Sequence, residues 1–221
     1  MTPGATARLF PDLEAGAPSR EGLAEGAVLL RAFASADEGA LMKAIDDLAA
    51  RAPFRHMMTP GGYRMSVAMT NCGARGWVSD RRGYRYDPLD PDTGRPWPAM
   101  PEVFLHLAAR AAREAGYDGF VPDACLVNRY EPGSRLSLHQ DRNEVDFDAP
   151  IVSLSLGLPA TFLFGGDERA ERPGRFRLIH GDVVVWGGPS RLRFHGVAPL
   201  KDGDHPLLGR RRINLTLRKA L

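Results

Sequence analysis

The spacing of apolar residues in the first half of the chain predicts an amphipathic helix. Residues 35–38 read Ser-Ala-Asp-Glu, a capping-box pattern in which the serine and the glutamate satisfy backbone donors at a helix start. Leu41, Ile45 and Leu48 follow at helical spacing. The apolar stretch at residues 26–33 predicts a strand just before this helix.

A second helix is predicted to begin near Pro101, because proline is favoured at the first helical position. Phe104, Leu107 and Ala111 continue at helical spacing. Gly116 is a suitable C-terminal end, since glycine tolerates the left-handed backbone found there.

Two segments lack a regular period. Residues 1–25 are rich in Pro, Gly and Ala and are expected to form an extended lead-in. Residues 53–97 are rich in Gly, Pro and Tyr, which predicts a hairpin-rich cover with no packed strand order.

After Asp123 the chain becomes a succession of short apolar stretches separated by Gly, Pro and Asp, a pattern typical of an antiparallel sandwich or barrel. The predicted strands are residues 124–130, 151–156, 161–164, 175–179, 182–186, 191–195 and 212–218. Helices followed by strands indicate an α+β class. We expect one catalytic domain at residues 26–221, with its sheet core at about 124–221.

Composition narrows the class without naming a function. The 221 residues suffice for one sizeable core, and 43% hydrophobic with 25% charged residues is ordinary for a globular protein. No apolar run approaches the roughly 20 residues of a membrane span, so a cytoplasmic protein without membrane contact is expected. Cys72 and Cys125 are expected to be reduced, packed thiols. A net charge of +2 permits nucleic-acid binding through a local basic patch but does not indicate it.

The triplet at residues 139–141, His-Gln-Asp, is the first candidate for chemistry. If it is a strand, His139 and Asp141 share a face, because side chains alternate. His195 from a distant strand would complete two imidazoles and one carboxylate, a set that suits Fe(II) and leaves room for O2 and a cosubstrate. The same set could hold zinc in a hydrolase, and a lone His-x-Asp also occurs by chance.

A second candidate lies near the C-terminus, where apolar and polar residues alternate over residues 212–218. The polar face consists of Arg212, Asn214, Thr216 and Arg218. A solvated strand would look similar, but two guanidiniums with an amide between them can also clamp a dicarboxylate. Asn128 and Tyr130 add two polar groups on one face of an upstream strand. A clamp beside the triad favours a 2-oxoglutarate-dependent oxygenase over a hydrolase.

Several longer stretches, taken together in their order and spacing, form a more specific pattern than either motif alone. They are residues 59–63, 65–73, 76–77, 128–141, 180–188, 191–196 and 212–218. In order and spacing they resemble the AlkB-type DNA dealkylation dioxygenases, and the likeness covers most of the chain from about Gly26.

The resemblance implies a double-stranded β-helix, or jelly roll, backed by helices, with an N-terminal nucleotide-recognition lid at about residues 53–97. It implies Fe(II), 2-oxoglutarate and O2 as cofactor and cosubstrates. The implied reaction is oxidative demethylation of 1-methyladenine and 3-methylcytosine, releasing formaldehyde, succinate and CO2. The implied partner is alkylated single- or double-stranded DNA, with RNA as an alternative, and we expect a monomer.

The resemblance also implies a role for each candidate side chain. The metal ligands would be His139, Asp141 and His195. The cosubstrate would contact Asn128, Tyr130, Arg212, Asn214 and Arg218. The substrate would contact Met69, Trp77, Tyr84, Arg135, Asn143 and Arg169. Trp77 would stack on the damaged base, because a methyl on a paired base is reached only by extruding the nucleotide.

One position departs from the family pattern. Where a second carboxylate is expected in the base pocket, this chain has Asn143, which forms hydrogen bonds but carries no charge. Glu144 is adjacent and should point elsewhere if the segment is extended. The departure affects the substrate preference and leaves the iron chemistry unchanged.

Two other functions fit parts of the pattern. One is an oxygenase that acts on RNA or on a protein side chain. The other is a binder of alkylated nucleic acid without turnover, against which the intact triad argues. His180, which precedes Gly-Asp, is interpreted as a structural residue in a turn.

Overall fold

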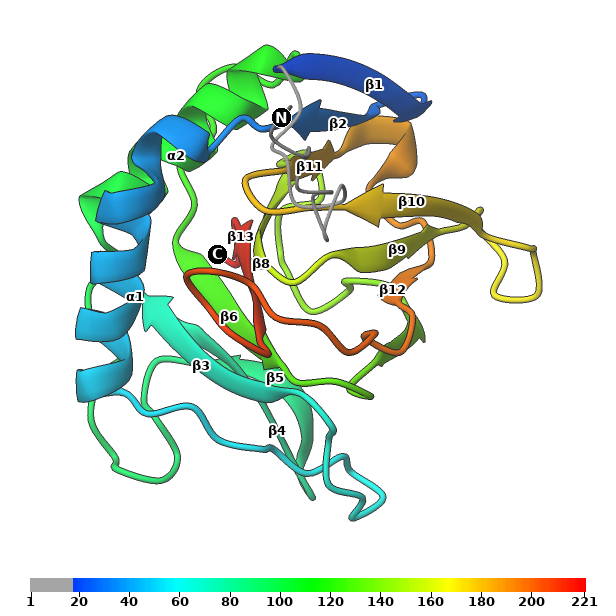
Figure 1. Cartoon of the computed structure of the whole chain (residues 1–221). Coiled ribbons are helices and arrows are strands. Elements are labelled where there is room, and N and C mark those ends of the chain that lie inside the picture. Colours follow the sequence, from blue (N-terminus) through cyan, green and yellow to red (C-terminus); the bar gives the residue numbers. More distant parts are fainter. Residues whose placement is uncertain (1–17) are drawn as a thin grey trace, which may run out of the picture.

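Two antiparallel sheets pack face to face, and two helices cover the outer side of the larger sheet (Figure 1). The structure is a computed structural model, and it describes residues 18–221. The larger sheet has the order β1 (Ser19–Ala24), β2 (Ala27–Arg31), β11 (Val183–Trp186), β8 (Ile151–Gly157), β13 (Arg212–Arg218), β6 (Ala124–Tyr130) and β3 (Ala68–Gly73). The smaller sheet has the order β10 (Gly174–Leu178), β9 (Ala160–Phe164), β12 (His195–Val197) and β7 (Leu136–His139).

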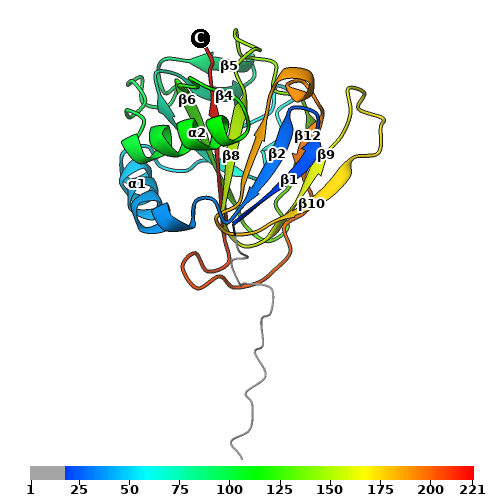
Figure 2. The same cartoon turned by 90° about the horizontal axis from the view of Figure 1, so that it is seen from above.

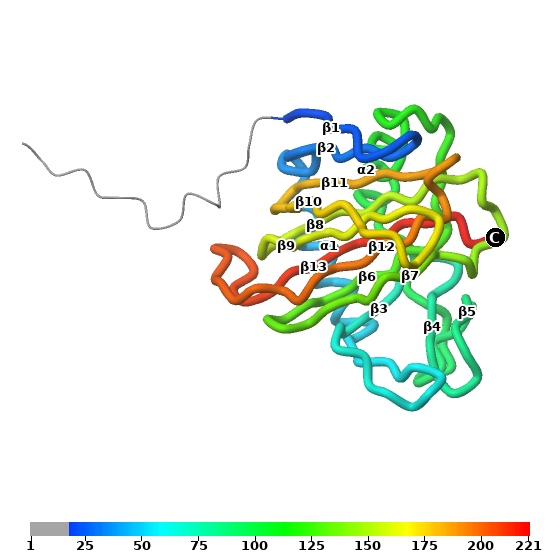
Figure 3. The backbone as a smooth tube through the Cα atoms, turned by 90° about the vertical axis from the view of Figure 1, so that its right-hand side faces the viewer, coloured from blue at the N-terminus to red at the C-terminus, as the bar shows by residue number. Residues whose placement is uncertain are grey.

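A separate hairpin of β4 (Gly76–Asp80) and β5 (Gly83–Asp87) lies beyond β3, at the far end of the larger sheet from β1 (Figure 3). The helical elements are η2 (Ser35–Asp37), α1 (Glu38–Arg51), α2 (Glu102–Glu114) and η3 (Gly188–Ser190). Figure 2 shows α1 and α2 on one flank of the molecule and β9 and β10 on the other. Antiparallel sheets with few helices agree with the predicted α+β class, and a jelly roll is consistent with this arrangement.

Side chains that alternate along each strand pack into two separate cores, one on each face of the larger sheet. Val28 and Leu30 of β2 belong to the core on the helical side of the sheet, which also contains Leu41 and Ile45 of α1. The intervening Leu29 packs inward with aromatic residues of β9. Because neighbouring side chains on a strand point to opposite faces, one apolar strand supplies both layers.

Strand β13 follows the same rule with a polar inner face. Ile213, Leu215 and Leu217 lie in the core beneath the helices, as the alternation predicted. The polar residues between them face the space between the sheets. The helices therefore bury one side of β13, and its polar side is left for a site.

Strand β3 shows that the prediction of no packed strand order in residues 53–97 was wrong. It is buried and pairs with β6 throughout its length. Its alternation was hidden because both faces are buried. The two polar residues are satisfied internally: Thr70 donates to the Ala52 carbonyl at 2.7 Å, and Asn71 bonds the backbone of Trp77.

The predicted strand at residues 191–195 was also wrong, because β12 begins only at His195. Arg191 turns into the interior after η3, where its guanidinium donates to the carbonyls of Ala149 at 3.1 Å and Asp141 at 3.0 Å. The predicted capping box does not form either. Residues 35–37 form a 3₁₀ turn without a side-chain cap, and Glu38 instead lies 2.8 Å from Nε2 of His180.

The other expectations concern the start of the chain and the cysteines. Residues 1–17 of the expected lead-in lie outside the described residues, and residues 19–24 form β1. Cys72 and Cys125 are free and buried, as predicted. Within residues 18–221, the helices are too short or too polar to cross a membrane.

Candidate active site

The three predicted metal ligands meet at one end of the smaller sheet. His139, the last residue of β7, is the register partner of His195 in β12, and their ring centroids lie 4.4 Å apart. Asp141 Oδ1 lies 3.7 Å from His139 Nε2, and Asp141 Oδ2 lies 3.6 Å from His195 Nε2. One ligand atom from each residue lies within 4.8 Å of the others, a spacing that could hold one metal ion.

The prediction of a strand through residues 139–141 holds only to His139, where β7 ends. The chain leaves the sheet there, and the Gln140 side chain donates to the Leu192 carbonyl. Asp141 nevertheless faces both histidines.

The backbone orients both imidazoles. Nδ1 of His139 donates to the Ser137 carbonyl at 2.9 Å, and Nδ1 of His195 donates to the Arg193 carbonyl at 3.0 Å. Because a carbonyl oxygen only accepts, each Nδ1 carries the proton and each Nε2 presents a lone pair. Burial, followed by the neighbouring His195, lowers the pKa of His139 to about 4, so the ring is neutral near pH 7. Neutral imidazole is the form that binds metal ions.

A buried network behind Asp141 holds its carboxylate in place. Arg218 contacts Asp141 Oδ2, and the Tyr86 hydroxyl donates to Glu144 Oε1 at 2.6 Å. Arg191 lies 3.3 Å from Glu144 and completes the set. Although burial alone raises the pKa of Asp141, the charge of the Arg218 guanidinium holds that pKa well below its usual range. The carboxylate therefore stays ionised as a ligand.

Sequence reasoning missed Tyr86 and Glu144. Glu144 points away from the base pocket, as expected, yet it does so as a buried partner of Arg191 and Tyr86. The period-2 relation of Tyr86 to Tyr84 on β5 could have shown that both belong to one face. For Glu144 the sequence carries no signal, because its partners are distant in the chain.

Arg212 presents unsatisfied hydrogen-bond donors. It is 1% exposed, Nη2 donates to Ser155 Oγ at 2.9 Å, and its guanidinium lies 4.9 Å from the ring centroid of Tyr130. Within residues 18–221 its Nε and Nη1 have no hydrogen-bond partner. A buried guanidinium with unpaired donors is costly unless a ligand such as a carboxylate accepts from it.

Asn128 and Asn214 lie opposite each other on β6 and β13, and Asn128 Nδ2 donates to Asn214 Oδ1 at 3.3 Å. Asn214 Nδ2 donates to Ser153 Oγ at 2.8 Å, which fixes the orientation of the amide. Asn128 Oδ1 is buried and has no protein partner within the described residues. Together with Arg212, this face offers a rigid polar wall.

One cavity of roughly 660 Å³ brings all the predicted site residues together. Its lining includes the metal candidates His139, Asp141 and His195, and the cosubstrate candidates Asn128, Tyr130, Arg212, Asn214 and Arg218. It also includes the substrate candidates Met69, Trp77, Tyr84, Arg135, Asn143 and Arg169. Trp186 also lines this cavity: it is buried, and its ring centroid lies 4.9 Å from that of His195.

The β4–β5 hairpin supplies an aromatic wall for this cavity. Trp77 and Tyr84 are stacked, with centroids 5.5 Å apart and planes 15° apart. The buried side chain of Asn71 holds the Trp77 backbone through two 3.0 Å hydrogen bonds. Trp77 Nε1 donates to Asn143 Oδ1 at 3.2 Å.

His180, by contrast, lies outside this cavity. Its Nδ1 accepts from the Gly157 N–H at 3.0 Å, and its ring stacks on His205 with a centroid distance of 4.7 Å. These contacts agree with the predicted structural role.

The comparisons with known proteins decide the family. The sequence profile of the 2OG-Fe(II) oxygenase superfamily matches residues 26–218. The chain belongs to this superfamily. Enzymes of this superfamily require Fe(II), 2-oxoglutarate and O2, and the site fits them: two imidazoles and a carboxylate suit iron(II), and the unpaired donors of Arg212 suit a carboxylate.

Individual relatives place it among the AlkB-type dioxygenases. It is 59% identical over 212 residues to the alpha-ketoglutarate-dependent dioxygenase AlkB of Escherichia coli K12, covering 96% of this chain and 97% of that protein. An AlkB homolog of Caulobacter vibrioides is 48% identical over 182 residues, covering 82% and 81%. The solved structure of OsALKBH1 superposes with a TM-score of 0.79 at 30% identity, covering 91% of this chain and all of that one.

Proposed function

We propose that this dioxygenase removes the methyl group from 1-methyladenine and 3-methylcytosine in alkylated DNA. The observation that carries the proposal is the joint lining of one cavity by the triad, the unpaired Arg212 guanidinium and Trp77. These features match the needs of a metal, a dicarboxylate and an extruded base, respectively.

His139, Asp141 and His195 would hold iron(II) through two Nε2 atoms and a carboxylate oxygen. Bound there with 2-oxoglutarate and O2, iron(II) supplies the oxidation of an N-methyl group to N-hydroxymethyl, with release of succinate and CO2. The N-hydroxymethyl group leaves as formaldehyde and restores the base. Trp186 and Phe162 pack around His195 and limit water on that side of the cluster.

Arg212 would bind one carboxylate of 2-oxoglutarate with its guanidinium, in which Nε and Nη1 have no hydrogen-bond partner among residues 18–221. Asn128, Asn214 and Tyr130 line the same wall and orient the cosubstrate. Arg218 is engaged with Asp141, so its predicted contact with the cosubstrate would be a second role.

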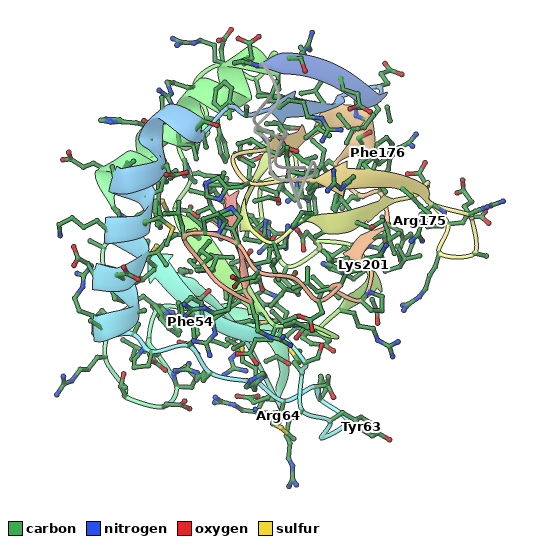
Figure 4. All side chains as sticks on the ribbon, in the orientation of Figure 1. Phe54, Tyr63, Arg64, Arg175, Phe176 and Lys201 are labelled. Atoms are coloured by element: carbon green, nitrogen blue, oxygen red, sulfur yellow. The ribbon has the colours of Figure 1, made fainter. Side chains whose placement is uncertain are left out.

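Trp77 would stack on the extruded base, with Met69 and Asn143 beside it, while Tyr84, Arg135 and Arg169 at the rim contact the nucleic-acid backbone. The loop before β3 and the β4–β5 hairpin would form the nucleotide-recognition lid, within the proposed residues 53–97. Tyr63 is 77% exposed, and with Arg64 it projects from this loop at the edge of the molecule (Figure 4), which supports a surface-binding role. We place this lid and the jelly-roll core at 124–221 in one catalytic domain, residues 26–221.

The direct test is incubation with iron(II), 2-oxoglutarate and single-stranded oligonucleotides carrying 1-methyladenine or 3-methylcytosine. Mass spectrometry should show loss of one methyl group and stoichiometric formaldehyde, and omission of 2-oxoglutarate should abolish both. Binding without any change in mass would instead support a non-catalytic binder.

RNA is the second candidate substrate. The tRNA demethylase abh1 of Schizosaccharomyces pombe is 37% identical over 158 residues, which covers 65% of this chain and 52% of that protein. Methylated RNA and methylated peptide of matched sequence and length should be assayed in parallel. Faster turnover of either than of methylated DNA would mean that DNA is not the preferred substrate. A monomeric state and a cytoplasmic location stay predictions.

A further inference from the structure

The hydrogen bond between Trp77 and Asn143 fixes how the Asn143 amide is turned. An indole N–H can only donate, so the atom that faces Trp77 Nε1 at 3.2 Å is the amide oxygen Oδ1. The amide nitrogen Nδ2 therefore points away from Trp77, and within residues 18–221 it has no hydrogen-bond partner. Two N–H donors remain available to whatever lies beside Trp77.

The cavity around this amide is lined by more cationic than anionic side chains. Arg64, Arg135 and Arg169 line it, in addition to the two arginines of β13. Its only carboxylate among the described residues is Asp141, which is bound by Arg218 and faces the two histidines. A cationic base in this cavity would meet no free carboxylate.

The acidic neighbour of Asn143 does not compensate. Glu144 is 5% exposed and does not line the cavity. It is held by the Tyr86 hydroxyl at 2.6 Å and by Arg191 at 3.3 Å. Its negative charge therefore interacts with buried partners behind the site, and it does not act inside the cavity.

N-methylated bases divide into two chemical groups at the edge that such an amide would read. In 1-methyladenine and 3-methylcytosine the ring is cationic near neutral pH and an amino donor adjoins the methylated nitrogen. In 1-methylguanine and 3-methylthymine the ring is neutral and a carbonyl acceptor occupies that position. An amide N–H matches the carbonyl, whereas a carboxylate would attract the cation and repel the carbonyl.

We propose that Asn143 makes this cavity accept neutral, carbonyl-bearing methylated bases on terms comparable with cationic ones. The inference rests on the proposed demethylase function and deepens it, because it assigns one residue to the choice between lesion classes. Trp77 contributes twice, as a stacking surface for the base and as the donor that orients the Asn143 amide.

The test is a competition among 1-methyladenine, 3-methylcytosine, 1-methylguanine and 3-methylthymine in otherwise identical single strands. The parent should demethylate the neutral lesions within about tenfold of the cationic ones. Asn143→Asp should lower the neutral-to-cationic rate ratio at least tenfold, and Asn143→Ala should give an intermediate ratio. Arg142→Gln is the matched control, because Arg142 is exposed and does not line the cavity, and its ratio should equal the parent's.

Binding of the same strands to iron-free protein, followed by fluorescence anisotropy, provides a second readout. Its dissociation constants should show the same reversal in Asn143→Asp. If no strand is demethylated by any variant but the binding ratio still shifts, the demethylase function fails and the role of Asn143 stands. An unchanged ratio in both assays, or a parent that prefers cationic lesions by clearly more than about tenfold, would overturn the inference.

Discussion

Arg218 approaches a single oxygen of Asp141, Oδ2, with two nitrogen atoms: Nε donates to it at 3.0 Å, and Nη2 lies 2.8 Å from it in an ion pair. Both residues are buried, so the pair holds the carboxylate at a fixed angle toward the two histidines. Arg212, six residues earlier on the same face of β13, instead has two nitrogen atoms without a hydrogen-bond partner among residues 18–221. The two arginines thus have different tasks, and their substitutions should separate metal binding from cosubstrate binding.

Arg212→Lys should raise the 2-oxoglutarate concentration needed for half-maximal rate at least tenfold, equivalent to about 1.4 kcal/mol. Lysine keeps the charge but cannot offer the forked pair of donors. The measurement is initial rate against 2-oxoglutarate concentration at saturating iron. Metal affinity in the same variant should stay at the parent value, and an unchanged requirement would place the clamp elsewhere.

Arg218→Lys should weaken metal binding by roughly 10–100-fold, because residues that orient a metal ligand tune its affinity. Titration of the protein with Mn(II), a redox-stable substitute for iron, measures this directly. Arg212→Lys is the matched control. Equal metal affinities in the two variants would contradict the division of tasks.

His139→Ala and Asp141→Ala should each abolish formaldehyde release while the protein stays folded, since the strand ladders do not depend on these side chains. Formaldehyde release and the thermal unfolding midpoint report the two effects separately. Zinc or cobalt should occupy the parent site without supporting turnover. A His139→Ala protein that retained a near-parent rate would refute the triad.

Trp77→Ala should weaken binding of every methylated oligonucleotide by about 1–3 kcal/mol, the contribution of one aromatic stacking surface. Trp77→Phe keeps a stacking ring but loses the N–H that holds Asn143, and should retain most of the affinity. Equilibrium binding of methylated and unmethylated strands measures the effect. Affinity for methylated strands that is insensitive to Trp77→Ala would remove Trp77 from the base site.

Gly196→Ala tests the close approach of the two ligand strands. A methyl group there would lie 2.6 Å from the Leu136 carbonyl oxygen and 3.1 Å from the Ser137 carbonyl carbon, so β12 must move away from β7. We expect a loss of about 1–3 kcal/mol in unfolding free energy, together with weaker metal binding. Gly39→Ala is the control, because nothing lies within 4 Å of a methyl group at that helical position and alanine favours helices. Denaturant unfolding measures both.

The sequence predicted helices and strands best where only one face of the helix or strand is buried. On β13 the apolar residues between Arg212 and Arg218 are spaced by two, so their face could be read without a structure. The helix around Leu41 and Ile45 was equally readable, because only one side of α1 packs on the sheet. Strand β3 was not readable, because burial on both faces removes the alternation, and hydrogen bonds from Thr70 and Asn71 make polar residues acceptable there.

By itself the sequence determined which residue types could meet in one site, since the spacing of His139 and Asp141 and the polar face of β13 are local patterns. Only the tertiary structure decided what each side chain does there. Arg212 and Arg218 are equivalent in the alternation, and their partners, Ser155 and Asp141, come from segments far away in the chain. The orientation of the Asn143 amide likewise depends on Trp77, a residue 66 positions earlier. Which group donates and which accepts between two distant segments depends on how those segments pack, and the local spacing of residue types does not encode it.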